Sequence, residues 1–449
     1  MAAANWKRGR IEYLNIKLTF QFGGFCCKNS SVRVLLVRCI FTFLRIDIAI
    51  RRMIGGVRIM LSSTELSKLN EANYREDRLE ALNHFYEDLC DQKVADGYIY
   101  SLSRYGKIFV NGAGGRFSYE EDSTQGMKTD TIFRIASITK LFTATAIWQL
   151  ADDGKIFMGQ PVSSILPEFD ADPFKPITIA HLLTHTSGIA PDHGTISDTY
   201  YKSAWWYIYE SELGKENWIK AGLSYGIRFP VGTQWMYSSF GYVVLGAIIE
   251  KITGVFAEDY IMDNIVKPLG MTDTFFDIPP EKAGRIAIRS EEAKEYLQKL
   301  QAGDLTDEER KSDEEIKTPG TGGGLYSTVN DLQKFGIMLL NQGEYEGGHI
   351  LSRMAVQKMT KRFNSEKLPN YAWGDGGADR PYGLGPDLRY NESTSYSEGT
   401  FFHEGWGSCS LVVDPVEKLI AVWYIPFHKN IWDGRGIFGS NNVIWSGLE

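Results

Sequence analysis

One stretch, Phe-Arg-Ile-Ala-Ser-Ile-Thr-Lys-Leu-Phe-Thr-Ala at 133–144, joins a strand-like run to a helical run. It contains the single S-x-x-K of the chain, from Ser137 to Lys140. Residues three apart share a helix face, so the Lys140 ammonium group is predicted to reach the Ser137 hydroxyl. A lysine accepts a serine's proton once burial or nearby positive charge lowers its pKa. The stretch therefore indicates a nucleophilic serine at a helix start, where free N–H groups point at the reacting atoms.

Strands are expected at both ends of the chain around a helical middle. The spacing of apolar residues predicts the following elements: a helix over 65–91, strands over 97–103, 107–112 and 131–135, a helix from Ser137 to about 152–154, a helix from about 241 to 254, a helix over 328–340, and strands over 408–413 and 419–425. This order predicts an α/β (α+β) fold, with an antiparallel sheet flanked by helices and an inserted, mostly helical lobe. The sheet lobe would comprise 61–154 and 320–449, the helical lobe 155–319, and the site would lie between them. The charged run 281–317 indicates either a solvated helix pair or a lid over a cleft.

The first 60 residues differ in composition from the rest. They hold eleven Lys and Arg residues against two acidic residues, Glu12 and Asp47. The most apolar part, 32–50, is interrupted by Arg33, Arg38 and Arg45, which argues against a membrane span. We expect 1–60 to be a basic extension outside the fold, with Met60 as a possible functional start and an organelle transit sequence as the alternative.

Composition otherwise describes an ordinary globular protein. Hydrophobic residues make up 43% of the chain and charged residues 23%, and the net charge is −8. This balance gives no reason to expect nucleic acid or an anionic membrane as a partner. Three of the five cysteines lie in the first 60 residues. The other two, Cys90 and Cys409, have no spacing typical of a metal site or redox pair, so a reducing, cytoplasmic location is expected. The oligomeric state is left open.

Two further motifs are candidates for the same site. The first is Tyr237-Ser238-Ser239, which opens a predicted helix; a phenol there can accept a proton if a neighbouring ammonium lowers its pKa. The second is His-Glu-Gly-Trp-Gly at 403–407, at the start of a strand. Glycines there let a substrate lie against the strand edge, and an exposed N–H can serve as an oxyanion donor. Each motif alone is more simply structural.

Three rival motifs are weaker. His181 and His185 have the i, i+4 spacing of zinc enzymes, but Leu182 stands where H-E-x-x-H has its glutamate. The glycine cluster at 320–324 is not followed by Gly-Lys-Ser/Thr, so it does not match a phosphate loop. The chain has no G-x-S-x-G, which argues against an α/β-hydrolase. No metal or organic cofactor is expected.

Taken together, these segments resemble the serine β-lactamase and penicillin-binding protein superfamily. The similarity is greatest to its class C-like branch, which includes esterases and D-amino-acid peptidases. It covers about 97–425 and rests on the following segments: FRIASITK at 133–140, HLLTHTSGI at 181–189, YSSFGY at 237–242, PLGM at 268–271, GGGLYST at 322–328 and HEGWG at 403–407.

The resemblance implies a role for each matching residue. Ser137 would be the acylated nucleophile and Lys140 its proton-accepting neighbour. Tyr237 would be the phenol shared between them, acting as base in acylation and activating water for deacylation. The N–H groups of Ser137 and Trp406 would form the oxyanion hole, and Ser239, His403 and Gly405 would bind substrate. His185 would be structural. Which group is the base differs between accounts of such enzymes.

Two departures from the family pattern favour an esterase or peptidase over a true β-lactamase. Ser239 replaces the asparagine of Tyr-x-Asn, and His403 replaces a lysine, so a substrate carboxylate loses a permanent positive partner. The sequence therefore predicts a serine hydrolase that forms an acyl-enzyme with an ester or small amide, including D-amino-acid peptides. The alternatives are a β-lactamase or penicillin-binding DD-peptidase, a metal hydrolase, and a non-catalytic binding protein on the same fold.

Overall fold

The computed structural model describes residues 11–13, 16–18, 62–192, 204–305, 316–364, 367–371, 378–388, 394–406 and 408–449. The chain divides into two compact units, Met1–Ser62 and Ser63–Glu449, each considered by itself. In the first unit, β1 (Ile11–Tyr13) pairs antiparallel with β2 (Ile16–Leu18). The rest of the predicted basic extension, including the apolar part at 32–50, lies outside the described residues.

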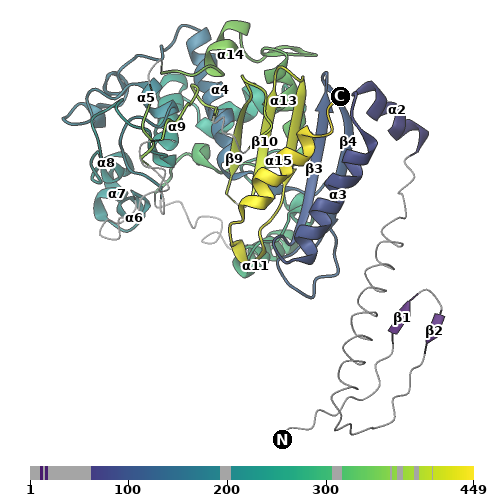
Figure 1. The fold of residues 1–449 in the computed structure, drawn as a ribbon. Coiled ribbons are helices and arrows are strands. Elements are labelled where there is room, and N and C mark those ends of the chain that lie inside the picture. The colour runs from purple at the N-terminus through teal and green to yellow at the C-terminus, as the bar shows by residue number, and fades with distance from the viewer. Residues whose placement is uncertain are drawn as a thin grey trace, which may run out of the picture. The chain divides into compact units, whose positions relative to one another are not determined.

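The second unit is built on a five-stranded antiparallel sheet (Figure 1). Its strand order is β4-β3-β11-β10-β9, so an early and a late segment of this unit meet where β3 pairs with β11. The strands are β3 (Gly97–Arg104), β4 (Lys107–Gly115), β9 (Phe401–Gly405), β10 (Cys409–Asp414) and β11 (Leu419–Tyr424). The predicted antiparallel sheet with helices on its faces is therefore confirmed.

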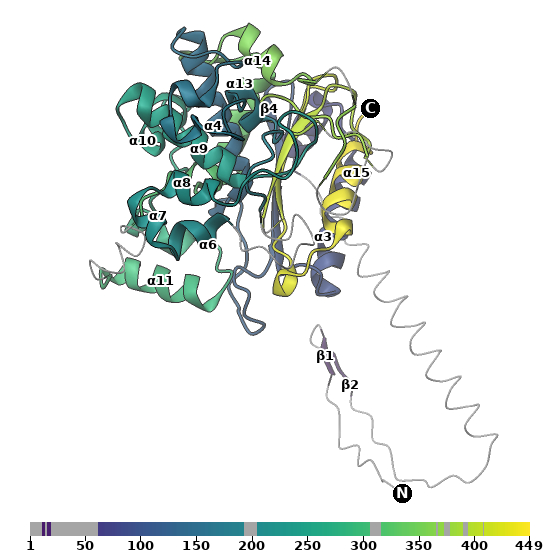
Figure 2. The same ribbon diagram turned by 90° about the vertical axis from the view of Figure 1, so that its left-hand side faces the viewer.

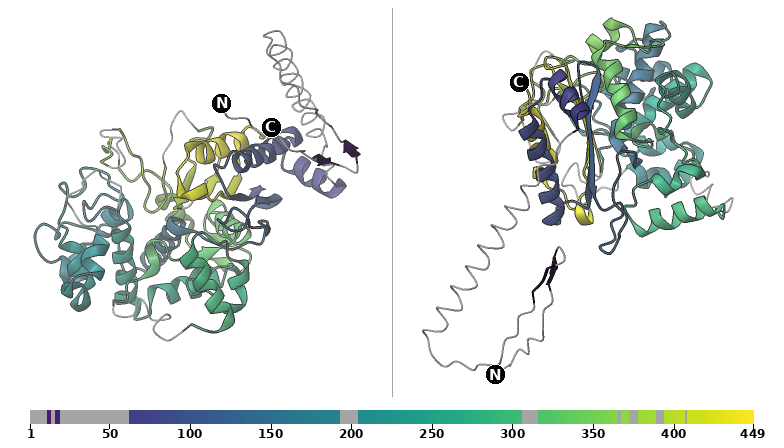
Figure 3. Two further views of the ribbon diagram at one scale, coloured as in Figure 1. Left: turned by 90° about the horizontal axis from the view of Figure 1, so that it is seen from below. Right: turned by 90° about the vertical axis from the view of Figure 1, so that its right-hand side faces the viewer.

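Helices cover both faces of this sheet (Figure 2). One face carries α3 (Glu76–Asp91) and α15 (Ser440–Trp445), and the other carries α13 (Val329–Leu340), behind which lies α4 (Thr139–Asp152). The Phe142 and Phe335 rings stack at 4.0 Å between their centroids, which joins α4 to α13. Views from below and from the right-hand side show the sheet between its two helical layers (Figure 3).

The α13 helix lies unusually close to the sheet. A Cβ atom on Gly336 would come within 2.9 Å of the Ile420 side chain on β11. The buried Gln333 side chain donates to the Ser101 carbonyl at 2.7 Å and accepts from the Ser103 hydroxyl at 2.6 Å. A buried amide is tolerated when its hydrogen bonds are made, so these contacts hold α13 in register on β3.

The predicted helix over 65–91 is two helices, α2 (Ser63–Glu71) and α3. The break comes at Asn73, which has a φ of 46°, and at Tyr74, whose backbone bridges to Leu448. Tyr74 is buried and its hydroxyl donates to the Ile444 carbonyl at 2.9 Å. Contact with the C-terminal segment therefore overrides the continuous helical pattern.

The third predicted strand, 131–135, is much shorter than expected. It is reduced to β5 (Phe133–Arg134), which pairs with β6 (Tyr326–Ser327) outside the main sheet. A further small pair is formed by β7 (Glu344–Tyr345) and β8 (Gly348–His349). A strand of two residues is too short for a sequence pattern to distinguish it from a loop.

The middle of the chain is helical, as predicted. Its helices are α5 (Ile179–Leu183), α6 (Ala204–Tyr209), α7 (Glu212–Glu216), α8 (Trp218–Leu223), α9 (Ser239–Thr253), α10 (Ala257–Ile261) and α11 (Glu291–Ala302), and α14 (Arg353–Met359) follows α13. Within the described ranges, no single helix has the length and hydropathy needed to cross a membrane. The pair 239–253 and 257–266 meets that test only jointly, and it is bent by 81°.

The charged run 281–317 is described in part. The α11 helix buries Leu297 and Leu300 in an apolar cluster, and its Lys294 ammonium donates to Glu120 at 2.7 Å. These contacts fasten α11 to the segment after β4, which favours the solvated-helix interpretation for this part. Residues 306–315 lie outside the described residues.

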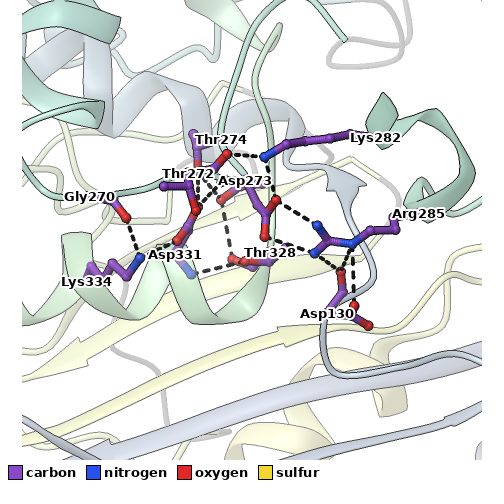
Figure 4. Close-up of polar contacts among 11 residues, drawn as sticks. Asp130, Gly270, Thr272, Asp273, Thr274, Lys282, Arg285, Thr328, Asp331 and Lys334 are labelled. Atoms are coloured by element: carbon purple, nitrogen blue, oxygen red, sulfur yellow. Dashed lines mark hydrogen bonds and ion pairs between the residues drawn. The ribbon is translucent and has the colours of Figure 1, made fainter. Parts of the chain in front are cut away.

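A polar network anchors the start of α13 (Figure 4). The buried Asp331 carboxylate accepts from the Asp273 backbone N–H at 2.7 Å and from the Thr274 hydroxyl at 3.1 Å. Asp273 in turn accepts from Arg285 at 2.8 and 2.9 Å. The network ties α13 to the loop after α10, so removing Asp331 leaves buried donors without their acceptor.

We expect Asp331→Ala to lower the free energy of unfolding by about 2 kcal/mol, because each buried donor that loses its acceptor costs about 1–3 kcal/mol. Urea unfolding followed by tryptophan fluorescence measures this loss. Asp263→Ala is the matched control, since Asp263 forms an exposed pair with Lys267 and such pairs contribute little. Equal stability of the two variants would contradict the anchoring role.

Candidate active site

Ser137 lies in a tight turn between β5 and α4. The turn is a 3₁₀ segment, Ala136–Ile138, rather than the first turn of the α-helix that the sequence predicted. Ala136 has a φ of 45°, a conformation that costs a non-glycine residue about 1–3 kcal/mol and is found where surrounding structure enforces it. The Ile135 N–H donates to the Leu325 carbonyl at 2.9 Å and so holds the segment before the turn. The Ser137 side chain remains half-buried, accessible to a ligand.

Lys140 lies one turn further on and is fully buried. Its Nζ atom is 3.0 Å from Ser137 Oγ, 2.9 Å from Ser239 Oγ and 2.6 Å from the Gly322 carbonyl oxygen. Burial lowers the pKa of Lys140 to about 8, although the Asp192 carboxylate opposes the shift. A neutral lysine has two N–H donors and one lone pair, so it can donate to Ser239 and Gly322 and still accept the Ser137 proton.

The carbonyl of Gly322 gives the glycine cluster at 320–324 a role that the sequence did not indicate. A Cβ atom on Gly322 would lie 3.2 Å from the Ser239 carbonyl oxygen, in tight contact with the start of α9. The cluster therefore lets the backbone pass close to α9 and present a carbonyl to the ammonium group.

Tyr237 lies just before α9, beside the same ammonium group. Lys140 Nζ is 4.8 Å from the centre of the Tyr237 ring, and the ring also packs on His185 at 4.4 Å between centroids. Burial raises the pKa of Tyr237 well above its usual value, although hydrogen bonding to Ser137 opposes the shift. The phenol is therefore protonated near neutral pH in this state of the site, while Lys140 is the group poised to lose its proton.

Asp192 completes the cluster, and the sequence analysis did not identify it. Its carboxylate accepts from the Ser239 backbone N–H at 2.6 Å and from the Ser239 hydroxyl at 2.6 Å. Asp192 follows the Thr-Ser-Gly-Ile-Ala-Pro segment at 186–191. The resemblance marks the His185 motif before it, but no local pattern distinguishes this aspartate from any other loop aspartate.

His403 lies on β9 and is buried against aromatic rings. Its Nδ1 is 2.7 Å from the Glu404 carbonyl, so that nitrogen carries the proton, and Nε2 accepts from the Tyr382 hydroxyl at 3.3 Å. Burial and the Lys140 charge lower the pKa of His403 to about 3. His403 is therefore neutral at physiological pH and supplies no positive charge. The centroid of its ring lies 6.3 Å from that of the Tyr237 ring.

The β9 strand ends at Gly405, beside the segment that leads to Ser137, and Trp406 follows it. A Cβ atom on Gly405 would lie 2.3 Å from the Ile135 carbonyl oxygen and 2.5 Å from Cys409 Sγ. Only a glycine lets β9 approach this closely. The Trp406 indole is 86% exposed, so its side chain is outside the core. The proposed oxyanion role of the Ser137 and Trp406 N–H groups stays a prediction.

We expect Gly405→Ala to lower kcat/KM for an ester at least about tenfold, because β9 must move away from Ile135 and small displacements of positioned groups are costly. Overpacking costs about 1–3 kcal/mol, so the thermal midpoint should fall as well. Gly159→Ala is the control, since the nearest atom to a Cβ there is 3.9 Å away. Steady-state kinetics on both variants measure this effect. An unchanged kcat/KM in Gly405→Ala would show that the close approach of β9 to Ile135 is dispensable.

The zinc-like pair His181 and His185 does not share one helix. The α5 helix ends at Leu183, and His185 has a φ of 56°. His181 Nδ1 accepts from the Thr178 N–H at 3.1 Å, within a capping box, and His185 Nδ1 accepts from the Ser238 N–H at 3.1 Å. The described residues include no group of three or more His, Cys, Asp or Glu arranged to hold a metal. Both imidazoles therefore accept hydrogen bonds from backbone N–H groups, and the His185 ring packs against the Tyr237 ring.

Comparison with known proteins places this chain in a family. The model of the family described as Beta-lactamase matches residues 82–434, more than half of the chain. Protein Rv1367c of Mycobacterium tuberculosis is 29% identical over 368 residues, which cover 75% of this chain and 87% of that protein. Esterase EstB of Burkholderia gladioli is 32% identical over 214 residues, 46% of this chain and 53% of EstB.

A solved structure supports the same fold. The penicillin-binding protein homologue from Caulobacter crescentus superposes with a TM-score of 0.63 at 18% identity, over 84% of this chain and 99% of that chain. At that identity the likeness concerns the fold, and the family match carries the assignment. The chain therefore belongs to the Beta-lactamase family and is a serine hydrolase of that family.

Proposed function

We propose that Ser137 is the nucleophile of this hydrolase and that it forms an acyl-enzyme with esters or small amides. The observation that carries this proposal is the 3.0 Å contact between Ser137 Oγ and Lys140 Nζ. The lysine is buried, has a pKa near 8, and holds two further acceptors in place. That combination is what an activated serine requires.

In the acylation step, neutral Lys140 takes the Ser137 proton while Ser137 Oγ bonds to the substrate carbonyl carbon. The carbonyl oxygen becomes negative and accepts from the N–H groups of Ser137 and Trp406. Collapse of this intermediate breaks the bond to the leaving group, which takes a proton from the Lys140 ammonium directly or through the Tyr237 hydroxyl. Water then repeats the sequence on the acyl-enzyme and releases Ser137 with its proton.

An ester or small amide fits this site better than a β-lactam. A penicillin carries a carboxylate, and the residue at the family's lysine position, His403, is neutral because its pKa is about 3. The buried Arg380 guanidinium is nearby, but it pairs with Asp387 through two hydrogen bonds of 2.6 Å, which offsets its charge. We therefore favour an esterase or a D-amino-acid peptidase over a β-lactamase or DD-peptidase. Esterase EstB is a relative whose name carries the first of these activities.

Intact-protein mass spectrometry tests the proposed function. The protein is mixed briefly with 4-nitrophenyl butyrate or, separately, with benzylpenicillin, and product is followed in the same samples because rapid turnover hides an adduct. We expect a butyryl adduct or butyrate release that depends on Ser137, with slower reaction of the penicillin. Penicillin turnover as fast as ester turnover would favour the β-lactamase alternative. Absence of both adduct and product would favour a non-catalytic binding protein.

The pH dependence should follow Lys140. Because Lys140 must lose its proton before it can accept another from Ser137, kcat/KM should rise as the pH increases and level off above about 8. The Asp192 carboxylate raises the Lys140 pKa, so Asp192→Asn should move this profile to lower pH. Initial rates with a neutral ester between pH 6 and 9 measure both effects. A flat profile would argue against Lys140 as the base.

We also propose a cytoplasmic, reducing location. Cys90 and Cys409, the cysteines within the described residues, are free thiols, which supports this location. Fractionation of the source cells with an antibody against the chain tests it.

A further inference from the structure

Asp192 and Ser239 form one wall of the site, and both are half-buried, so a ligand can reach them. The Ser239 hydroxyl is 2.6 Å from Asp192 Oδ2 and 2.9 Å from Lys140 Nζ. The Ser239 N–H donates to the other carboxylate oxygen at 2.6 Å. Two hydrogen bonds in sequence thus connect the carboxylate to the lysine that contacts Ser137.

The positions of the hydrogen atoms on this wall determine whether it offers donors or acceptors to a substrate. A serine hydroxyl has one hydrogen, and the short contact assigns that hydrogen to the Asp192 carboxylate. An ionised carboxylate only accepts hydrogen bonds. The wall therefore offers acceptors to a substrate, whereas the asparagine of the family's Tyr-x-Asn offers a donor and an acceptor together.

The negative charge of Asp192 also favours a hydrogen-bond donor on the substrate. In the reactive state Lys140 is neutral, so it no longer compensates the negative charge of Asp192. A positive group on the substrate then restores the balance next to the reacting carbonyl. An acceptor at the same place, such as the carbonyl of an acylamino group, would face lone pairs without a hydrogen between them, which is unfavourable.

We infer that this wall selects substrates whose acyl part carries an amine next to the reacting carbonyl, with Asp192 as the specificity-determining residue. The inference rests on the proposed function, because it needs Ser137 to attack that carbonyl. The preferred substrates are aminoacyl esters and aminoacyl amides with a free amino group.

Two esters of nearly equal shape test the inference. In alanine benzyl ester an ammonium group stands where benzyl isobutyrate has a methyl group. We expect wild-type protein to favour the alanine ester, in the better of its two enantiomers, by about tenfold or more in kcat/KM, as hydrogen bonds to charged groups imply. N-acetylalanine benzyl ester, which loses the charge and gains a carbonyl, should be a poorer substrate than the free amine.

The Asp192→Asn variant should bring the ratio of the two rates close to one, because the amide keeps the shape of the wall and removes its charge. The ratio is measured within each variant, so a general loss of activity cancels. Asp170→Asn is the matched control, since Asp170 pairs with Lys175 on the exposed surface. It should keep the wild-type ratio.

The outcomes separate this inference from the proposed function. Ser137-dependent hydrolysis of both esters at equal rates would overturn the inference and leave the proposed function intact. The same follows if the preference is present but survives Asp192→Asn. If neither ester, nor a simple aryl ester, is hydrolysed in a Ser137-dependent way, both the proposed function and the inference fail.

Discussion

The Ser137→Ala variant is expected to form no acyl adduct and to lose about 10³- to 10⁶-fold in kcat/KM, the range seen when one member of a catalytic unit is removed. The loss should be this large because Ser137 supplies the hydroxyl at the centre of the 3₁₀ turn, 3.0 Å from Lys140 Nζ. Ser239, the other hydroxyl that contacts Lys140, is engaged with Asp192. Intact mass and product release after mixing with 4-nitrophenyl butyrate measure the effect.

Stability separates a chemical effect of Ser137→Ala from a structural one. The side chain is half-buried and the turn is held by backbone hydrogen bonds of Ile135 and Ile138, so the thermal midpoint should change little. Ser67→Ala, on the exposed face of α2, is the matched control for activity. Residual activity in Ser137→Ala above about one tenth of wild type would place the nucleophile elsewhere.

The Lys140→Met variant is expected to lose about 10²- to 10⁴-fold in kcat/KM, the usual contribution of a general base, or more if Ser137 and Lys140 act as one unit. Methionine has nearly the length of lysine and fills the buried space without a lone pair that accepts the Ser137 proton. The buried Gly322 carbonyl loses the hydrogen bond from the ammonium, so the thermal midpoint should also fall, by the equivalent of about 1–3 kcal/mol. Stopped-flow acylation with an activated ester isolates the affected step.

Lys140→Arg tests which property of the lysine matters. The guanidinium keeps the positive charge and does not deprotonate in proteins, so it cannot act as a base. If Lys140 accepts a proton, Lys140→Arg should be about as slow as Lys140→Met. Substantial activity in Lys140→Arg would instead mean that the residue acts through its charge, and Tyr237 would become the better candidate for the base.

The elements that sequence predicted well are those with long, regular patterns. The four strands over 97–104, 107–115, 409–414 and 419–424 have alternating or continuous apolar runs bounded by turn residues, and each lies where it was expected. The α13 helix begins after Thr328, whose hydroxyl accepts from the Asp331 N–H at 3.2 Å. Such caps act within four residues, so they are readable from the sequence.

The errors came where distant segments change local structure. The expected helix over 65–91 breaks because Tyr74 pairs with the C-terminal segment at Leu448. Ser137 lies in a 3₁₀ turn rather than an α-helical one because the chain before it is held by Leu325 and pressed against β9. Helical spacing records neither influence, since both partners lie far along the chain.

The same distinction applies to the active site. The contact between Ser137 and Lys140 follows from three-residue spacing on a helical segment, so it was predictable from the sequence before any fold was known. The wall formed by Asp192 and Ser239 was not predictable from the sequence. These two residues are 47 positions apart and meet only through the packing of α9 against α5. The neutral state of His403 depends likewise on burial beneath Tyr382 and beside Lys140. Local spacing thus predicts the proposed nucleophile and its proposed base. Charge, proton positions and substrate preference depend instead on desolvation and on partners that only the folded chain brings together.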